Sequence, residues 1–226
     1  QKDSRFSKCV RMESLTGKKG SFDRISATAA VKRTTRHGDT PLISTPHDRR
    51  WVFSSFYEIS DLIDDADKVQ LVADPTSSYV QNMAHALNRS MDDEIIAAFF
   101  GDAISGEDGG STVSFPAANQ IAHNFGGSAS DISAAKLKAA RKILRANEVD
   151  ADEELYCAIS AEQFEALLAD DQIINRDYSL INKLDEGEIV KFMGFNFIAS
   201  ERLLTDASGY RRVPVWAKNG MVCARR

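Results

Sequence analysis

The clearest hydrophobic pattern in the chain lies between residues 75 and 100. Apolar side chains recur there every three or four positions, the spacing that places them on one face of a helix. They are Val80, Met83, Leu87, Met91, Ile95 and Phe99. Asp74 is a suitable N-cap, Pro75 suits the first helical position, and Gly101 suits the residue after the helix. We therefore predict one helix over 75–100, far longer than the usual 11–12 residues or so, which acts as a structural spine.

The second half of the chain alternates short helical and strand patterns. Residues 133–146 carry apolar side chains three or four positions apart, which predicts a helix. Ser160 and Gln163 have the spacing of a capping box, which predicts a helix that ends at Leu168. Strands are predicted at 156–159, 189–192, 195–198, 213–216 and 221–223, with shorter ones around Val113 and Ile121 and a hairpin turn at Gly194. Several strands with helices between them indicate a mixed α+β body.

Residues 8–33 show the alternation of a β-hairpin. Val10 and Met12 alternate with charged residues, and residues 16–20 contain the glycines that a loop tip needs. The return arm places Ile25, Ala27, Ala29 and Val31 on one face. Neither face is strongly apolar, and an isolated two-stranded hairpin is marginal in water. We therefore predict a projecting ribbon that becomes ordered on contact with a neighbour.

The segments that follow join this ribbon to the body. Residues 34–50 are polar and contain glycine and two prolines, which predicts a loop. Residues 51–53 and 56–57 are largely aromatic and predict a strand that ties the base of the ribbon to the body. The acidic stretch 61–67 predicts the start of a short helix that reaches Leu71.

Charge is divided unevenly along the chain. Residues 1–50 hold 12 basic and 5 acidic side chains, whereas residues 51–226 hold 16 basic and 28 acidic ones, for a net charge of −5. The basic segment is also poor in large apolar side chains, so it cannot bury enough surface to fold alone. We expect it to lie on an acidic partner, which is either nucleic acid or the acidic remainder of another copy of the chain.

Composition excludes several protein classes. The 226 residues are 43% hydrophobic and 27% charged, as in soluble globular proteins, and they suffice for one large domain or two small ones. No apolar run reaches the length of about 18 residues that spans a membrane. Cys9, Cys157 and Cys223 are far apart and form no closely spaced pair, which argues against a zinc site or a disulfide framework.

The search for catalytic or metal-binding patterns gives little. Glycine-rich phosphate loops, nucleophile elbows and paired zinc-binding histidines are missing from the sequence. His37 is better explained as a polar turn residue than as a general base, and Cys157 as a small core residue than as a nucleophile. The acidic group Asp61, Asp64, Asp65 and Asp67 lacks the glycine and glutamate of a calcium loop. We predict no catalytic site, metal or cofactor.

Several runs of the sequence nevertheless occur in a familiar order between about residues 20 and 215. They are Phe22-Asp23-Arg24-Ile25, Arg36-His37-Gly38-Asp39-Thr40-Pro41, Arg49-Arg50-Trp51-Val52, Asp61-Leu62-Ile63-Asp64, Asp74-Pro75-Thr76-Ser77-Ser78-Tyr79, Ala86-Leu87-Asn88-Arg89-Ser90-Met91-Asp92-Asp93, Phe99-Phe100-Gly101 and Phe192-Met193-Gly194-Phe195. In these runs the chain resembles the major capsid proteins of tailed bacteriophages.

This resemblance implies the α+β capsid fold of the Hong Kong phage type. That fold has an extended-loop (E-loop) hairpin, a long spine helix in a peripheral domain, and a mixed axial domain near the symmetry axis of the capsomer. We assign an N-terminal segment and E-loop to residues 1–60 and the peripheral domain to 61–126. The axial domain is assigned to 127–210, and a strand region that returns toward the peripheral domain to 211–226.

The resemblance also implies a function. A protein of this family is a structural coat subunit, not an enzyme, and assembles into pentamers and hexamers of an icosahedral shell around double-stranded DNA. Its partners are copies of itself, portal, scaffold or cement proteins, and weakly contacted DNA. No membrane is involved, and the protein belongs to the virion after assembly in the host cytoplasm. The candidate inter-subunit contacts are Lys18, Lys19, Arg24, Arg33, Arg36, Arg49, Arg50 and Trp51.

Three alternatives stay open from the sequence. The basic segment 1–50 suits direct nucleic-acid binding, although aromatic side chains are scarce in it. A bacterial encapsulin-type compartment is a related kind of shell. A hydrolase that uses His37 or Cys157 requires these side chains to converge in a cleft. For Lys18 and Lys19, we favour electrostatic contacts with neighbouring subunits over covalent crosslinks.

Overall fold

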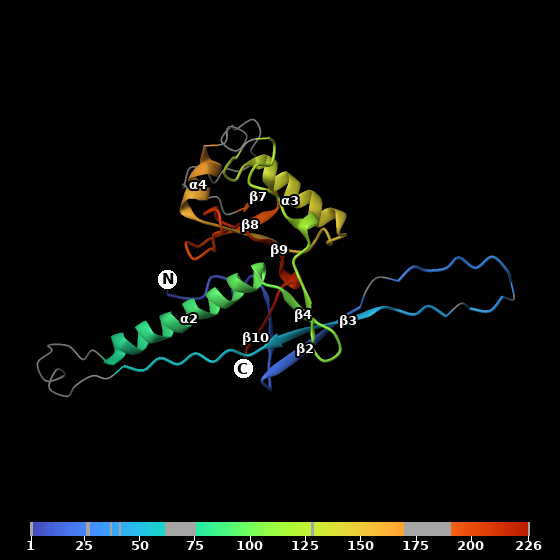
Figure 1. The fold of residues 1–226 in the computed structure, drawn as a ribbon, viewed down its shortest axis with the longest axis horizontal. Coiled ribbons are helices and arrows are strands. Elements are labelled where there is room, and N and C mark those ends of the chain that lie inside the picture. The colour runs from blue at the N-terminus through green and yellow to red at the C-terminus, as the bar shows by residue number, and fades with distance from the viewer. Residues whose placement is uncertain are drawn as a thin grey trace, which may run out of the picture. The chain divides into compact units, whose positions relative to one another are not determined.

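The computed structural model describes residues 2–25, 28–36, 38–40, 42–61, 76–127, 129–169 and 191–225. Their contacts divide the chain into two compact units. The first unit comprises Gln1–Glu13, Phe56–Phe100 and Pro116–Cys223. The second comprises Ser14–Ser55, Gly101–Phe115 and Ala224–Arg226. Each unit is described by itself below, and Figure 1 labels the helices and strands.

The first unit is built on a mixed four-stranded sheet. Its spatial order is β7 (Lys191–Phe192), β8 (Phe195–Ala199), β6 (Leu155–Ile159) and β9 (Val215–Ala217). β6 and β8 run parallel, with Leu155 opposite Phe195, and the other two pairs are antiparallel. A parallel pair needs a crossover connection, and α4 (Ala161–Leu168) lies in the chain between these two strands.

Alternating side chains of β6 supply two hydrophobic clusters, one on each face of the sheet. Leu155, Cys157 and Ile159 pack with Leu137 of α3 (Ala134–Ala146) and Leu167 of α4. Ala158, between them in sequence, belongs to the other cluster. That second cluster also contains Phe6, Val10, Ile95, Ile96, Leu203 and Trp216. The sheet is therefore covered by α3 and α4 on one face and by the C-terminal half of α2 on the other.

The long helix α2 (Thr76–Phe100) confirms the strongest sequence prediction. At about 1.5 Å per residue its 25 residues span about 38 Å. Ile95 and Ile96 near its end are buried, whereas Tyr79, Val80 and Leu87 near its start are exposed. The apolar stripe is thus covered by this chain only toward the C-terminus of the helix, within the residues that the structure describes.

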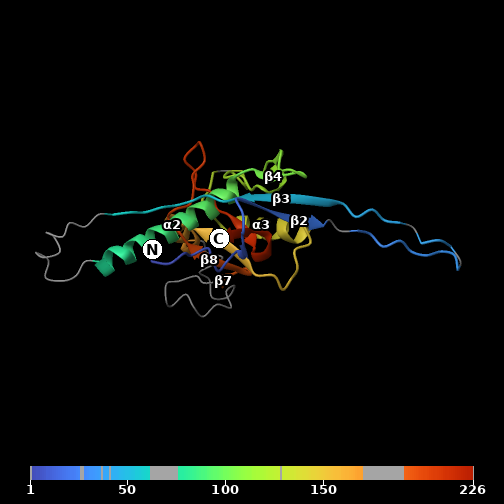
Figure 2. The same cartoon turned by 90° about the horizontal axis from the view of Figure 1, so that it is seen from below.

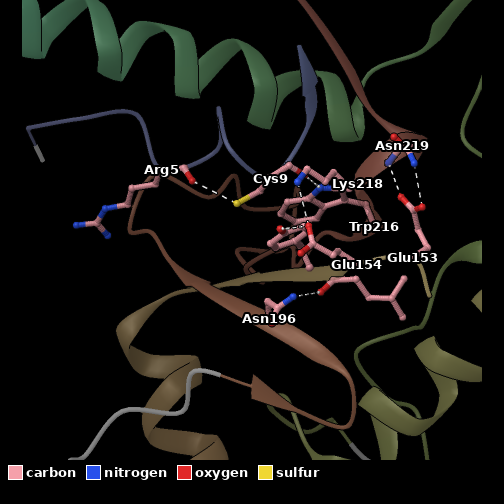
Figure 3. Close-up of polar contacts among 10 residues, drawn as sticks. Arg5, Cys9, Glu153, Glu154, Asn196, Trp216, Lys218 and Asn219 are labelled. Atoms are coloured by element: carbon pink, nitrogen blue, oxygen red, sulfur yellow. Dashed lines mark hydrogen bonds and ion pairs between the residues drawn. The ribbon is translucent and has the colours of Figure 1, made fainter. Parts of the chain in front are cut away.

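The N-terminal segment is held in the first unit by a buried carboxylate. Asp92 of α2 is fully buried and accepts hydrogen bonds from Ser4 Oγ at 2.5 Å, Arg5 N at 3.0 Å and Phe6 N at 3.4 Å. Farther along, Trp216 Nε1 donates to the carbonyl of Cys9 at 2.9 Å, as Figure 3 shows. Residues 4–9 are therefore fixed by polar contacts as well as by the burial of Phe6.

The second unit contains an antiparallel four-stranded sheet. Its order is β2 (Lys19–Ile25), β3 (His47–Phe53), β4 (Ala103–Ser105) and β5 (Ser111–Val113). In the β2–β3 pair, Lys19 lies opposite Phe53 and Ile25 opposite His47. The hairpin therefore spans 19–53, and the described residues between its strands, 28–36, 38–40 and 42–46, form an extended loop without helix or strand.

The predicted hairpin over 8–33 is wrong. Its first strand, β1 (Arg11–Ser14), pairs with β10 (Val222–Arg225) instead of with β2. Arg11 N donates to Met221 O at 3.0 Å and Leu15 N to Arg225 O at 2.9 Å. Residue numbers thus rise in the same direction along both strands, so the two strands are parallel. The glycine-containing residues 16–20 thus connect strands of two different sheets. A Cβ on Gly20 would collide with Leu15 Cδ1, so the Leu15 side chain would have to move to accommodate a larger residue there.

Most other local predictions agree with the structure. The helix at 133–146 is α3, and Ser160 and Gln163 form the expected capping box of α4. Gly194 turns between β7 and β8 with a φ of +84°. The strand expected around Ile121 is not formed, and the loop expected over 34–50 ends earlier because residues 47–50 belong to β3. The predictions for 62–75 and for 189–190 fall outside the described residues.

Candidate assembly surface

We call residues 19–53, that is β2, β3 and the loop between them, the ribbon. Asp23 and Arg49 lie opposite each other in its two strands, and Arg49 Nε donates to Asp23 Oδ1 at 2.7 Å. This hydrogen bond lowers the pKa of Asp23 and raises the pKa of Arg49. Arg49 therefore has an acidic partner within its own ribbon.

The base of the ribbon is tied together in the same way. Arg50 pairs with Asp48 at 3.0 Å, while Trp51 Nε1 donates to the carbonyl of Gly106 at 2.8 Å. The Lys19 ammonium lies 4.8 Å from the centre of the Trp51 ring. Three predicted contact residues (Arg50, Trp51 and Lys19) thus serve contacts inside the second unit.

Trp51 also explains the glycines of the β4–β5 turn. Gly109 has a φ of +80°, and a Cβ there would approach the Trp51 ring to 3.2 Å. The backbone of the turn can therefore lie close against the indole. Trp51 lies more than 50 positions earlier in the chain, so no local sequence pattern indicates this contact.

The tip of the ribbon is organised by Arg33. Its guanidinium donates to the carbonyls of Thr35 at 3.0 Å, Arg36 at 2.7 Å and Gly38 at 3.2 Å. Lys18, Arg24 and Arg36 are exposed, and no ion pair involves them within the described residues. These three remain the predicted candidates whose charge is available to a partner.

The loop of the ribbon is exposed along nearly its whole described length. Only Gly38 and Thr45 are half-buried among its described residues, 28–36, 38–40 and 42–46. Val31 is 63% exposed, Ile43 48%, and Leu42 is fully exposed. Figures 1 and 2 both show the two sides of the loop running along each other to a distal tip. Apolar side chains without cover beside exposed cations are typical of an interaction surface.

A second set of exposed apolar side chains lies in the first unit. Phe56 is 69% exposed and Tyr57 51% exposed, just before the described chain breaks off at residue 61. Tyr57 donates a hydrogen bond to Glu94 of α2, and this bond raises the pKa of the phenol. The segment thus lies along α2, whose own Tyr79, Val80 and Leu87 are exposed.

The described residues give no sign of a reactive centre. They contain no group of three or more potential metal ligands. Cys157 is fully buried, and burial raises the pKa of its thiol well above its usual range, so the nucleophilic thiolate is disfavoured. His37, the other residue of the hydrolase alternative, lies outside the described residues. Among the helices described here, none combines the length and apolarity of a membrane span.

Comparison with known proteins gives the family. A family model described as phage capsid protein matches residues 1–226, the whole chain. The chain belongs to the phage capsid protein family. The resemblance noted in the sequence is therefore confirmed, and with it the structural role of this capsid protein as a component of the virion. A search of curated proteins finds no match.

Solved structures confirm the fold class. The capsid of cyanophage P-SCSP1u is 18% identical, with a TM-score of 0.69 over 97% of this chain and 74% of that one. The capsid of Ralstonia phage GP4 is 11% identical, with a TM-score of 0.69 over 99% of this chain and 78% of that one. The mature capsid of bacteriophage PhiM1 is 16% identical, with a TM-score of 0.62 over 97% and 73%. The predicted α+β capsid fold is thus correct for this capsid protein.

Proposed function

We propose that this capsid protein is the major coat subunit of an icosahedral shell, in which pentamers and hexamers of identical copies enclose double-stranded DNA. The observation that carries the proposal is the ribbon, whose loop exposes Val31, Leu42 and Ile43 without cover from its own chain. A two-stranded ribbon of this kind gains stability when another surface supports it. In a shell, that surface belongs to the next copy.

The same geometry favours a repeating assembly over a simple dimer. A ribbon that lies on a different surface of the next copy makes a heterologous contact, and heterologous contacts propagate into rings or lattices. Each contact can be weak, because many of them act together once the shell closes. The domain assignment stays part of this proposal: E-loop within 1–60, peripheral domain 61–126, axial domain 127–210 and a returning strand region 211–226.

Charge supports the proposed cargo. Beyond residue 50 the chain carries 16 basic and 28 acidic side chains, so most of the subunit repels phosphate. If this acidic part of the subunit lines the inside of the shell, it holds DNA only weakly, and the DNA can move during packaging. We extend the proposal to assembly in the host cytoplasm, to contacts with portal, scaffold or cement proteins, and to a purely structural role without catalysis.

The test removes the loop and keeps the strands. Replacing residues 26–46 with Asn-Gly leaves Ile25 and His47 joined by a two-residue turn that suits an antiparallel hairpin. Because nearly all described loop residues are exposed, we expect the variant to keep its circular dichroism spectrum and its cooperative unfolding. Under conditions where the unmodified chain forms particles in the electron microscope, the variant should form none.

Three results would count against the proposal. Normal particles from the shortened variant would show that the loop is dispensable for assembly. Particles of the unmodified chain that assemble in infected or expressing cells but never protect DNA from nuclease would instead favour a compartment of the encapsulin type. Retention of unassembled subunits on DNA, falling steeply with salt, would favour the nucleic-acid-binding alternative.

A further inference from the structure

Strand β2 ends the four-stranded sheet of the second unit and has one open edge. It is the outermost strand of the order β2-β3-β4-β5, so β3 is its one neighbour in that sheet (Figure 1). It is seven residues long, contains no proline, and pairs with β3 without interruption from Lys19 to Ile25. Proteins usually shorten, bulge or interrupt such an edge, because it can pair with a strand of another chain. The edge of β2 is therefore a candidate interaction surface.

The pairing of β2 with β3 decides which backbone groups face the open edge. Ser54 N donates to Lys18 O at 3.0 Å, which extends the register of the two strands by one pair and makes that pair a hydrogen-bonded one. Hydrogen-bonded and non-hydrogen-bonded pairs alternate along an antiparallel ladder. The residues of β2 whose N–H and C=O groups point away from β3 are therefore Lys19, Ser21, Asp23 and Ile25. All four are exposed, and within the described residues their outward groups form no hydrogen bond.

Strand length indicates what can cover this edge. The other described strands at the ends of sheets are β1, β5, β7, β9 and β10, and none of them is longer than four residues. Among the described strands with an open edge, only β2 of a second copy therefore matches the length of β2. Parallel pairing in register would place every charged residue beside its own copy, which is unfavourable. Two copies of β2 should therefore pair in the antiparallel direction.

Like charges exclude the neighbouring antiparallel registers. Residues with outward groups must lie opposite each other to exchange hydrogen bonds, so the centre of the pairing can move only by whole residues. A pairing centred on Ser21 places Lys18 opposite Arg24 of the other copy. A pairing centred on Asp23 places two copies of this carboxylate opposite each other. Both arrangements oppose like charges, which destabilises a sheet.

The register centred on Phe22 avoids both conflicts. The two Phe22 side chains then lie directly opposite each other, and aromatic pairs of this kind stabilise a sheet. Lys19 of one copy lies diagonally across from Asp23 of the other, within reach of a long side chain. Every outward N–H of one strand also meets an outward C=O of the other, because Lys19 pairs with Ile25 and Ser21 pairs with Asp23.

We propose that β2 pairs with β2 of a second copy in this antiparallel register, so that two sheets become one across a twofold axis. The contact is isologous, because the same edge serves both copies. It rests on the proposed shell function, in which copies meet and twofold axes occur, and it deepens that function by naming a contact separate from the loop of the ribbon. One such contact is weak, because the edge groups exchange water for each other, but many act together in a shell.

A cysteine at position 22 tests the register directly. In the proposed pairing the two copies of residue 22 form a non-hydrogen-bonded pair with Cα atoms about 4.5 Å apart, which a disulfide can bridge. Two copies of residue 24 lie four positions apart along the strands, or about 13 Å, which is too far. After mild oxidation, Phe22→Cys should therefore give at least about tenfold more disulfide-linked dimer than the matched control Arg24→Cys. The unmodified chain controls for its own cysteines.

A proline at position 21 tests the edge independently. Ser21 N–H points away from β3, so Ser21→Pro removes no hydrogen bond from the sheet, but it cannot donate to a second strand. Combined with Phe22→Cys, it should lower the yield of linked dimer by about tenfold or more, whereas Ser21→Ala, which keeps the amide, should not. Alone, Ser21→Pro should lower the oligomer content in sedimentation relative to Ser21→Ala. Circular dichroism and urea unfolding establish that each variant folds.

Three results would overturn the inference. The first is equal or absent dimer from Phe22→Cys and Arg24→Cys. The second is Ser21→Pro that assembles as well as Ser21→Ala, a result that does not depend on the folding of the cysteine variants. The third is a loss of assembly with Ser21→Pro while Phe22→Cys gives no dimer, because the edge would then bind a different strand.

The outcome also separates this inference from the proposed function. Linked dimers from a chain that forms no shell contradict only the shell function. Shells in which Phe22→Cys gives no linked dimer contradict only the pairing of β2 with β2. A chain that stays monomeric and unlinked at every protein concentration contradicts both.

Discussion

Trp216 connects more of the first unit than any other aromatic residue described here. It is 6% exposed, its ring lies 4.4 Å from that of Phe99 and 6.0 Å from that of Phe6, and its indole donates to the Cys9 carbonyl. A strand near the C-terminus is thereby joined to the N-terminal segment and to the end of α2. At the residue scale, this one side chain therefore joins three separate segments of the first unit.

Replacing Trp216 with Phe should destabilise the first unit by about 2 kcal/mol. The change leaves the buried Cys9 carbonyl without its donor, which alone costs about 1–3 kcal/mol, and leaves a small gap beside Phe99. Urea unfolding of the purified chain measures the loss. Tyr79→Phe, at an exposed position of α2, is the control and should change stability by less than about 0.5 kcal/mol. Equal free energies of unfolding for the two variants would contradict the claim that the contacts of Trp216 stabilise the first unit.

Tyr156 predicts a pH dependence at alkaline pH. Burial, and then its hydrogen bond to Glu154, raise the pKa of Tyr156 to about 12, from the usual value of about 10. Between these values the unfolded chain loses this proton and the folded chain keeps it, so the unfolded state binds fewer protons. The contribution of Tyr156 to the free energy of unfolding is therefore fully present below about pH 10 and falls as pH rises toward about 12.

In the Tyr156→Phe variant, the free energy of unfolding should fall less steeply with rising alkaline pH than in the unmodified chain, although the change also removes a hydrogen bond. Unfolding free energies of both chains between pH 9 and 12 or so give the two slopes, and their difference isolates the phenol from the lysines that titrate in both. Parallel slopes for the two chains would show that this hydroxyl does not titrate differently on folding.

Single residues also show where local sequence patterns stop being informative. Arg49 and Arg50 were predicted as inter-subunit contacts because their segment is basic. The partner of Arg49, Asp23, depends on the pairing of β2 with β3, which local alternation did not indicate. The partner of Arg50, Asp48, lies two positions earlier in the same strand. Cys157 was assigned correctly, because a small apolar residue inside a strand pattern rarely has another role than packing.

At the scale of elements, the attachment of the N-terminal segment to α2 depends on one carboxylate. Asp92→Ala removes the acceptor of Ser4 Oγ and of the Arg5 and Phe6 amides. The buried Phe6 amide is then unsatisfied, which costs about 1–3 kcal/mol, and the two partly buried donors lose their fixed acceptor. We expect the segment to detach and trypsin to cleave after Arg5 or Lys8 many times faster than in the unmodified chain. Mass spectrometry of a digestion time course identifies these cuts.

Asp93→Ala is the matched control, because it changes the next residue of the same helix. Asp93 pairs with Arg202 at the surface, where a salt bridge contributes at most about 1 kcal/mol. This variant should keep the N-terminal segment protected. If both variants, or neither, become sensitive to trypsin at these positions, the N-terminal segment is not held on α2 by Asp92.

Helices and strands could be predicted where the hydrophobic periodicity or the capping residues lie within one segment of the sequence. The helix over 75–100 has periodicity and an end signal, and α4 has its capping box within four residues. The hairpin was misplaced because pairing is a property of two segments. Val10 and Met12 alternate as a strand should, but their partner strand lies about 210 positions later in the chain. The β2–β3 pair is separated by a loop too long for a turn signal.

At the scale of the whole molecule, the family resemblance predicted more than local patterns did. It gave the capsid fold and the structural role, both of which the comparisons support. It did not indicate which cations have partners inside the ribbon, because the contact of Arg49 with Asp23 depends on the register of β2 and β3. Exposed loop residues and a half-covered helix make the chain appear incomplete until a neighbour is added.

Electron cryomicroscopy of particles formed by the unmodified chain tests this central claim most directly. We expect a closed icosahedral shell in which residues 28–46 of every copy lie on an adjacent copy and bury Val31, Leu42 and Ile43. Density that shows these residues folded against their own subunit, or bare to solvent in an intact shell, would contradict it.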